Sequence, residues 1–228
     1  MITLLNIDCM EYMATVPDKY FDLAIVDPPY GIKESAHRNL SRTKLAKTRL
    51  YRREVWDQKI PSQKYFNELC RISKNQIIWG INYYYRRKIR PYSAGRIIWD
   101  KCNDGTNFSD CEIAYCSFHH STRIFRFLWN GMIQGTPGNG TKMQGNKKLN
   151  QRRIHATEKP IPLYHWIFRR YANPDFKIID THGGSMSSVI AAFDFGIKEM
   201  TCCESDKITF DEAVKRFEFH KKQLTINY

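Results

Sequence analysis

Long hydrophobic runs are missing from this chain of 228 residues. No apolar stretch approaches the roughly 20 residues that a helix needs to span a bilayer. The opening residues, MITLLNIDCMEY, also lack a basic segment followed by an apolar core, which is the pattern of a secretory signal. We therefore expect a soluble, cytoplasmic protein.

Cysteine pairs with zinc-site spacing are missing as well. The seven cysteines are an odd number, and no two of them form a C-x-x-C pattern. Cys102, Cys111, Cys116 and His119 come nearest to a ligand set, but their spacing does not fit one. We expect reduced thiols and no metal site.

Acidic residues are scarce in two segments. Residues 113–157 contain no Asp or Glu and seven Lys or Arg, whereas residues 33–53 contain one acid and eight Lys or Arg. The whole chain has a formal net charge of +13. Such an excess is typical of proteins that bind a polyanion, most often nucleic acid. The alternative is a solvated basic surface without a partner.

Strand-length apolar runs recur along the chain, and helical patterns lie between several of them. One helix follows a candidate N-cap at Ser62, one follows Pro160, one begins near Ser185, and one contains Phe210 and Phe217. This alternation predicts a doubly wound α/β sheet. The expected strands are Leu4–Ile7, Leu23–Val26, Gln76–Trp79, Ile97–Trp99, Ile113–Phe118, Lys177–Ile179 and Met200–Cys203.

The domain organisation follows from length and composition. Hydrophobic residues make up 42% of the chain, which indicates one well-filled core. We find no internal repeat and no second domain, so residues 1–228 are expected to form a single domain. The two basic segments, extended to residues 33–55 and 119–153, are expected to be long loops on the binding side of the sheet.

The stretch FKIIDTHGGSMSS predicts a strand, an acid, a glycine pair and then a helix. In doubly wound sheets such a turn lets the backbone approach a nucleotide-like cofactor. Glu204 follows Gly184 by 20 residues, close to the offset of an acid that holds ribose hydroxyls. Because G-x-G-x-x-G is missing, a smaller adenosyl cofactor is favoured over a dinucleotide. The alternative is a simple tight turn.

The stretch FDLAIVDPPYGI raises a different question, because a buried strand ends in the bare carboxylate of Asp27. Pro28 and Pro29 fix their φ angles and carry no N–H, so the turn is stiff and its carbonyl groups point outwards. Taken alone, the pattern also fits a proline turn that ends a strand.

Three motifs in consistent order carry a resemblance. DPPY (27–30), HATEKP (155–160) and DTHGGSMS (180–187) are similar to motifs of the S-adenosyl-L-methionine-dependent DNA amino-methyltransferases. With the catalytic motif first and the cofactor loop last, the chain resembles the circularly permuted beta group. The resemblance implies a Rossmann-like class I methyltransferase sheet, doubly wound and mostly parallel, with an antiparallel edge strand.

The resemblance also implies the roles of individual residues. In the cofactor loop, Met186 replaces the usual last glycine, and Ala156 replaces a proline in the preceding segment. The implied catalytic residues are Asp27, Pro28, Pro29 and Tyr30. The implied cofactor-binding residues are Asp8, Cys9, Asp27, His155, Thr157, Lys159, Asp180, His182, Gly183, Gly184, Ser185, Ser187 and Glu204.

The chemistry of the DPPY turn follows from the weak nucleophilicity of an exocyclic base amine. We expect Asp27 and the Pro28 carbonyl to accept hydrogen bonds from the amine, and Tyr30 to stack on a flipped base. The methyl group is then expected to pass directly from the cofactor sulfonium to nitrogen. Asp8 has an alternative role as a helix N-cap, and Lys159 an alternative as a surface lysine.

DNA contacts are expected from the two basic segments, through phosphates and base edges. The reading segment is short, so we expect a short recognition site or a second subunit that completes recognition. The residues are Arg38, Arg42, Lys44, Lys47, Arg49, Arg52, Arg53, Arg123, Arg126, Lys142, Lys147, Lys148, Arg152 and Arg153.

We therefore predict a DNA methyltransferase that acts on the N6 amine of adenine. The alternatives are a cytosine-N4 enzyme and a non-catalytic nucleic-acid-binding subunit with a decayed methyltransferase fold. Motif order disfavours RNA or protein as substrate. The expected partner is double-stranded DNA, which implies association with the nucleoid, and a homodimer or a restriction-system partner is a further expectation.

Overall fold

The computed structural model describes residues 1–32, 59–90, 92–105, 109–129, 133–136, 151 and 158–226. Residues 224–226 are described by their backbone alone. Most of the expected DNA contacts and two expected cofactor contacts, His155 and Thr157, lie outside these ranges. The expected DNA contacts outside them are Arg38, Arg42, Lys44, Lys47, Arg49, Arg52, Arg53, Lys142, Lys147, Lys148, Arg152 and Arg153.

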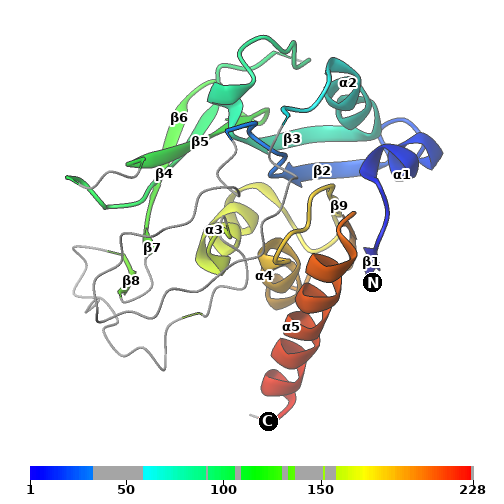
Figure 1. Ribbon diagram of the computed structural model, residues 1–228, viewed down its shortest axis with the longest axis vertical. Coiled ribbons are helices and arrows are strands. Elements are labelled where there is room, and N and C mark those ends of the chain that lie inside the picture. The colour runs from blue at the N-terminus through cyan, green and yellow to red at the C-terminus, as the bar shows by residue number, and fades with distance from the viewer. Residues whose placement is uncertain are drawn as a thin grey trace.

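The core of the fold is an eight-stranded sheet (Figure 1). Its strands, in spatial order, are β1 (Ile2–Leu5), β10 (Glu199–Cys203), β9 (Lys177–Asp180), β2 (Phe21–Val26), β3 (Ser73–Trp79), β5 (Cys111–Cys116), β4 (Arg96–Asp100) and β6 (Thr122–Arg126). All neighbouring pairs are parallel except the two that involve β5. The predicted mostly parallel α/β sheet is confirmed.

The position of the antiparallel strand differs from the prediction. We expected it at the edge, but β5 lies inside the sheet, with β4 and β6 beyond it. The chain turns back after β4, so that Asp100 pairs with Cys111, and β5 then inserts between β3 and β4. Strand order of this kind depends on pairing across the hairpin, which apolar runs alone do not specify.

Helices cover both faces of the sheet (Figure 1). Alternating residues of β2 serve the two faces, because successive side chains of a strand point to opposite sides. The helices are α1 (Cys9–Thr15), α2 (Gln63–Ile72), α3 (Ile161–Tyr171), α4 (Ser187–Phe195) and α5 (Lys207–Ile226). Leu23 and Ile25 belong to the core packed by α3, α4 and α5, whereas Ala24 and Val26 belong to the core packed by α1 and α2.

Local signals at the helix starts match the predictions. The Asp8 carboxylate accepts the Met10 N–H at 2.7 Å and caps α1. Ser62 accepts the Tyr65 N–H in the same way at the start of α2. Helix α3 begins directly after Pro160, with Pro162 in its first turn, where a missing N–H costs nothing.

Part of the segment expected to be a loop is regular structure. Residues 122–126 form the edge strand β6, and β7 (Leu128–Trp129) pairs with β8 (Gln134–Gly135). Phe125 is buried, whereas its neighbours in β6 are exposed. One buried side chain therefore holds this strand, and its sequence lacks the apolar run that would have predicted it. The described helices include none with the length and apolar content to cross a membrane, and all seven cysteines are free.

Candidate active site

The topology of the sheet brings two of the predicted motifs together. The connection from β2 to β3 runs to one side and that from β9 to β10 runs to the other, so the order reverses between β9 and β2. These two strands are parallel, with Leu23 opposite Ile178 and Ala24 opposite Ile179. Ligands of open α/β sheets bind at the carboxyl ends of strands at such a switch point. Asp27 and the glycine loop both lie there.

Asp27 sits in a cluster of charged side chains. Its Oδ2 forms an ion pair with Lys159 Nζ at 2.5 Å, and its Oδ1 accepts a hydrogen bond from the Tyr30 hydroxyl at 2.6 Å. Lys159 also contacts Glu112 Oε2 at 3.0 Å, and Lys101 Nζ lies 2.8 Å from Glu112 Oε1. Two carboxylates and two ammonium groups therefore form a balanced network at the end of β2.

Two members of this network, Glu112 and Lys101, were not predicted as site residues. Because β5 runs antiparallel, its first residues lie at the carboxyl edge of the parallel strands, and Glu112 pairs there with Trp99 of β4. Lys101 directly follows β4. An acid at the start of an otherwise apolar strand was the available signal, since a charge there needs a partner.

Burial and neighbouring charges set the pKa values of the cluster. Burial and the Glu112 charge raise the pKa of Asp27, although Lys159 opposes them. Burial alone would lower the pKa of Lys159, but Asp27 and Glu112 outweigh it and the pKa is raised. Burial also opposes ionisation of Glu112, yet Lys159 and Lys101 bring its pKa down to about 2. Asp27 is therefore the carboxylate that protonates first as the pH falls.

The proline turn is held by contacts with Tyr30, Tyr83 and Tyr84, which we call the tyrosine row. The Tyr84 hydroxyl donates to the Pro28 carbonyl at 2.6 Å and to the Pro29 carbonyl at 3.1 Å. The ring of Tyr83 stacks on Tyr30 at 4.8 Å between centroids. Both predicted acceptors, the Asp27 carboxylate and the Pro28 carbonyl, thus receive hydrogen bonds from the protein's own side chains.

Gly80 makes room for this arrangement at the end of β3. It adopts φ +75°, and a Cβ atom there would lie 2.2 Å from Tyr30 Cε1. A glycine is needed for both reasons, the left-handed backbone and the close aromatic ring. Gly80 follows the apolar run IIW in the sequence, but the sequence does not predict that Tyr30 packs against it.

The glycine loop is equally tight. A Cβ atom on Gly183 would lie 2.4 Å from Cys202 Sγ in the neighbouring strand β10. The Gly183 N–H donates to the Cys203 carbonyl at 2.8 Å, and the Gly184 N–H donates to Glu204 Oε2 at 2.9 Å. The predicted pair of Gly184 and Glu204 is therefore in direct contact. The ribose role of Glu204 stays a prediction.

Met186 occupies a strained position at the start of α4. Its φ of 57° lies in the left-handed region, where a residue with a side chain is uncommon. The side chain is completely buried in the core, which offsets the strain. The substitution of the usual glycine is thus absorbed by packing beneath the loop, on the side of the α3–α5 core.

Arg216 of α5 ties the glycine loop to the segment that carries Lys159. Its Nη1 donates to the Ser185 carbonyl at 2.7 Å and to Ser187 Oγ at 3.2 Å. Its Nη2 lies 2.9 Å from Glu158 Oε1, and the Glu158 side chain is fully buried. Ser185 and Ser187 therefore hold the loop shape, in addition to any contact with a ligand.

Burial shifts the pKa values of Asp180 and His182, which flank the loop, towards their uncharged forms. Burial raises the pKa of Asp180 to about 7, although the Ser188 hydroxyl and the His182 N–H both donate to its carboxyl group. Burial lowers the pKa of His182 to about 4. The Tyr65 ring packs edge-on against His182 at 5.3 Å. His182 is uncharged at neutral pH and can present its ring to an apolar surface.

The buried Asp180 carboxyl group gives folding stability a definite pH dependence. Its folded pKa of about 7 lies above the ordinary value of 3.8, so stability is lost as the pH rises through that interval. Relative to Asp180→Asn, the wild-type protein should lose about 2 kcal/mol of unfolding free energy between about pH 5 and about pH 7.5. Urea unfolding of both proteins at the two pH values measures this, and parallel pH profiles would contradict it.

The remaining predicted cofactor residues lie at the same edge. Strand β1 pairs with β10, so that Leu5 is opposite Cys203, and Asp8 and Cys9 follow β1 close to the end of β10. Asp8 is exposed and caps α1. Burial and the nearby Asp8 charge raise the pKa of the Cys9 thiol to about 12, so it stays protonated.

Two of the predicted DNA contacts lie in the described residues, both on β6. Arg123 and Arg126 are exposed on this outer strand. Arg126 pairs with Asp100 of β4 at 3.2 Å. Whether they contact DNA stays a prediction.

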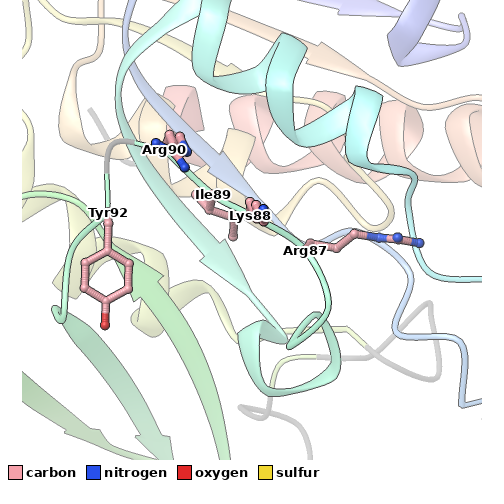
Figure 2. Close-up of a pocket in the computed structure, with 5 residues that line it drawn as sticks. All are labelled: Arg87, Lys88, Ile89, Arg90 and Tyr92. Atoms are coloured by element: carbon pink, nitrogen blue, oxygen red, sulfur yellow. The ribbon is translucent and has the colours of Figure 1, made fainter.

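A basic hollow that the sequence reading missed lies just beyond the tyrosine row. It measures about 630 Å³ and is lined by Arg87, Lys88, Ile89, Arg90 and Tyr92. Arg87 comes three residues after Tyr84, and the Gln63 amide holds Lys88, donating to its carbonyl at 2.7 Å and accepting from its N–H at 2.8 Å. Figure 2 shows Arg87 extending away from the other four side chains. Tyr92 is 77% exposed beside these cations.

Metal-binding geometry is absent from the described part of the chain. No three His, Cys, Asp or Glu side chains gather there as a candidate ligand set. The balanced cluster around Asp27 has its own ammonium partners in Lys159 and Lys101.

Comparison with solved structures defines the class of fold, a Rossmann-like α/β sheet shared with DNA methyltransferases. The M1.HpyAVI–SAM complex matches with a TM-score of 0.54 and 17% identity, over 95% of this chain and 100% of that one. TTHA0409 of Thermus thermophilus, a candidate DNA modification methylase complexed with S-adenosyl-L-methionine, gives 0.57 and 14%, over 96% and 94%. The cytosine-N4-specific PvuII DNA methyltransferase gives 0.58 and 13%, over 95% and 86%.

Among curated proteins, one particular relative is a candidate methylase of Escherichia coli (strain K12) named YubD. It is 24% identical over 203 residues, which cover 83% of this chain and 78% of YubD. No protein-family model matches the chain. At these identities the structural likeness establishes the fold.

Proposed function

We propose that this protein is an S-adenosyl-L-methionine-dependent DNA methyltransferase of the permuted, DPPY-containing kind. The observation that carries the proposal is the meeting of Asp27 and the Gly183–Gly184 loop at one switch point of the sheet. An amine-activating corner beside a cofactor loop is what methyl transfer to a base amine needs. The similarity to YubD and to the two solved complexes with S-adenosyl-L-methionine supports it.

The residues present fit the proposed cofactor. Within the described part of the chain, a Cβ atom at Gly184 would meet only the His182 carbonyl, at 4.0 Å, so the loop leaves space for a ligand. Glu204, directly after β10, would hold ribose hydroxyl groups, whereas Asp8 would contact the adenine and the uncharged His182 ring would lie against it. When bound, S-adenosyl-L-methionine supplies an electrophilic methyl group on a positively charged sulfur.

The protein's own groups activate the amine. Asp27 and the Pro28 carbonyl each accept a hydrogen bond from one of the two amine N–H groups. This turns the nitrogen towards a tetrahedral geometry, in which its lone pair is available for attack. Tyr84 holds the Pro28 carbonyl in place, and the stiff prolines keep it from turning away. Tyr83 already covers one face of Tyr30, so a flipped base stacks on the other face or takes the place of Tyr83.

We infer that the target is the N6 amine of adenine. An Asp at the first position of the catalytic motif is more typical of adenine enzymes, whereas Ser is more typical of cytosine-N4 enzymes. The second candidate is cytosine N4, which the likeness to the PvuII enzyme favours.

The DNA partner is supported by charge. The formal net charge of +13 and the basic hollow next to the tyrosine row suit a phosphate backbone close to the proposed catalytic corner. The exposed Tyr85 and Tyr92 add rings on which unpaired bases can stack. Binding of this kind weakens steeply as salt is added.

The test is methyl transfer from radiolabelled S-adenosyl-L-methionine to unmethylated duplex DNA, followed by digestion to nucleosides. N6-methyladenine is the expected product, and N4-methylcytosine would replace it with the second candidate. Label on tRNA or protein but not on DNA would contradict the proposal. If calorimetry showed no cofactor binding at millimolar concentration and no transfer occurred, a non-catalytic binder would take its place.

A further inference from the structure

Lys159 lies between two carboxylates at the proposed catalytic corner. Its Nζ is 2.5 Å from Asp27 Oδ2 and 3.0 Å from Glu112 Oε2. The Lys159 side chain is only 3% exposed. An ammonium group this deep cannot turn to water for its hydrogen bonds, so its position is set by the two acids and by the Tyr30 hydroxyl, to which it donates at 2.9 Å.

The contact with Asp27 conflicts with the proposed chemistry. A carboxylate that accepts from a buried ammonium group is a weaker acceptor for a second donor, because part of its charge is already neutralised. The ammonium charge also repels the positive charge that develops on the attacking nitrogen. Fast methyl transfer therefore requires that Lys159 stop neutralising Asp27.

Glu112 offers a second acceptor to both groups that cover Asp27. The Tyr30 hydroxyl, which donates to Asp27 Oδ1 at 2.6 Å, lies 3.3 Å from Glu112 Oε2. Lys159 contacts that same Glu112 oxygen. Lys101 binds the other oxygen, Oε1, at 2.8 Å and fixes the carboxylate in place. Neither donor needs a new partner when it leaves Asp27.

We propose that Glu112 is a positioning residue that takes over Lys159 and Tyr30 when the target amine binds, and so frees Asp27 to accept from that amine. The inference rests on the proposed function. No covalent step is involved, since one set of hydrogen bonds replaces another at constant charge.

Glu112→Gln is the direct test. The amide keeps the shape of the side chain but loses the charge that draws Lys159 away, so Lys159 stays on Asp27. The single-turnover rate of methyl transfer at saturating cofactor and DNA should fall about 10- to 100-fold, whereas both dissociation constants should stay within about twofold. Glu199→Gln, the same change on β10 beside Tyr20 and Lys177, is the matched control and should keep the wild-type rate.

Rescue separates positioning from a merely structural role. Lys159→Met in the Glu112→Gln background removes the competing cation and restores charge balance. This double variant should recover at least about tenfold in single-turnover rate over Glu112→Gln. If it does not recover at saturating cofactor, Glu112 has another role and the inference is wrong.

A structure of the wild-type protein with DNA and an unreactive cofactor analogue decides the question even if Glu112→Gln fails to fold. Lys159 Nζ should lie within hydrogen-bond distance of Glu112 and beyond it from Asp27. Lys159 still bound to Asp27 beside the target amine would overturn the inference. Methyl transfer that is normal in Glu112→Gln would overturn this inference alone, whereas absent transfer in the wild-type protein would overturn the proposed function.

Discussion

Replacement of Asp27 by alanine is expected to lower the single-turnover rate of methyl transfer by about 10²–10³-fold, the loss seen when one preorganised group is removed from a reacting centre. Alanine offers no acceptor to the target amine, so the Pro28 carbonyl alone cannot reshape it. Asp27→Asn should lose much less, because the amide oxygen remains an acceptor at the same place. Rapid-quench measurement of labelled DNA gives the three rates.

The fold should survive both changes at Asp27. Lys159 retains Glu112 as a partner in each variant, so no buried ammonium group is left alone. Thermal unfolding is the control and should stay close to wild type, and the rates are measured at saturating cofactor because Asp27 is also an expected cofactor contact. An Asp27→Ala protein with the wild-type rate would remove the acceptor role and, with it, the proposed mechanism.

Gly183→Ala is expected to have the second large effect, a loss of cofactor affinity together with about 1–3 kcal/mol of unfolding free energy. The added Cβ atom would lie 2.4 Å from Cys202 Sγ, a fully buried atom of β10 that has nowhere to move. The loop must shift instead, and its contacts with Cys203 and Glu204 shift with it. Calorimetry with S-adenosyl-L-methionine and urea unfolding measure the two losses.

A compensating change tests the cause. Cys202→Ala removes the sulfur, and the next contact of the new Cβ atom is the Cys203 carbonyl at 3.4 Å, which is nearly ordinary packing. The double variant should therefore regain most of the cofactor affinity lost by Gly183→Ala, with Cys202→Ala alone as its control. If both losses persist in the double variant, the tight approach of loop and strand is not what glycine provides here.

Much of the fold was predictable because its signals are local. Apolar runs of strand length, proline at the start of α3 and the capping residues Asp8 and Ser62 each act within a few residues. The place of β5 was not predictable in the same way, because it depends on which strands pair across the sheet. Because β5 lies inside the sheet, Glu112 reaches the centre of the candidate site.

The candidate site likewise combines local features, which the sequence predicts, with long-range contacts, which it does not. The two motifs whose residues lie consecutively, DPPY and the glycine loop, were placed from the sequence at one end of the sheet. The partners that hold them come from distant segments: Tyr84 under Pro28, Glu112 beside Asp27 and Cys202 against Gly183. These contacts are set by packing between elements, and no spacing rule in a single sequence specifies them.

The guanidinium of Arg216 has a consequence for the order of events. One planar group binds the loop at Ser185 and the carboxylate of Glu158, which directly precedes Lys159. Separating a buried charged pair of this kind costs several kcal/mol, so the two segments move as one rigid piece. A molecule that settles into the loop would thereby also hold the main chain beside Lys159, so that only the Lys159 ammonium group exchanges partners when the base arrives, and we expect the small substrate to bind first.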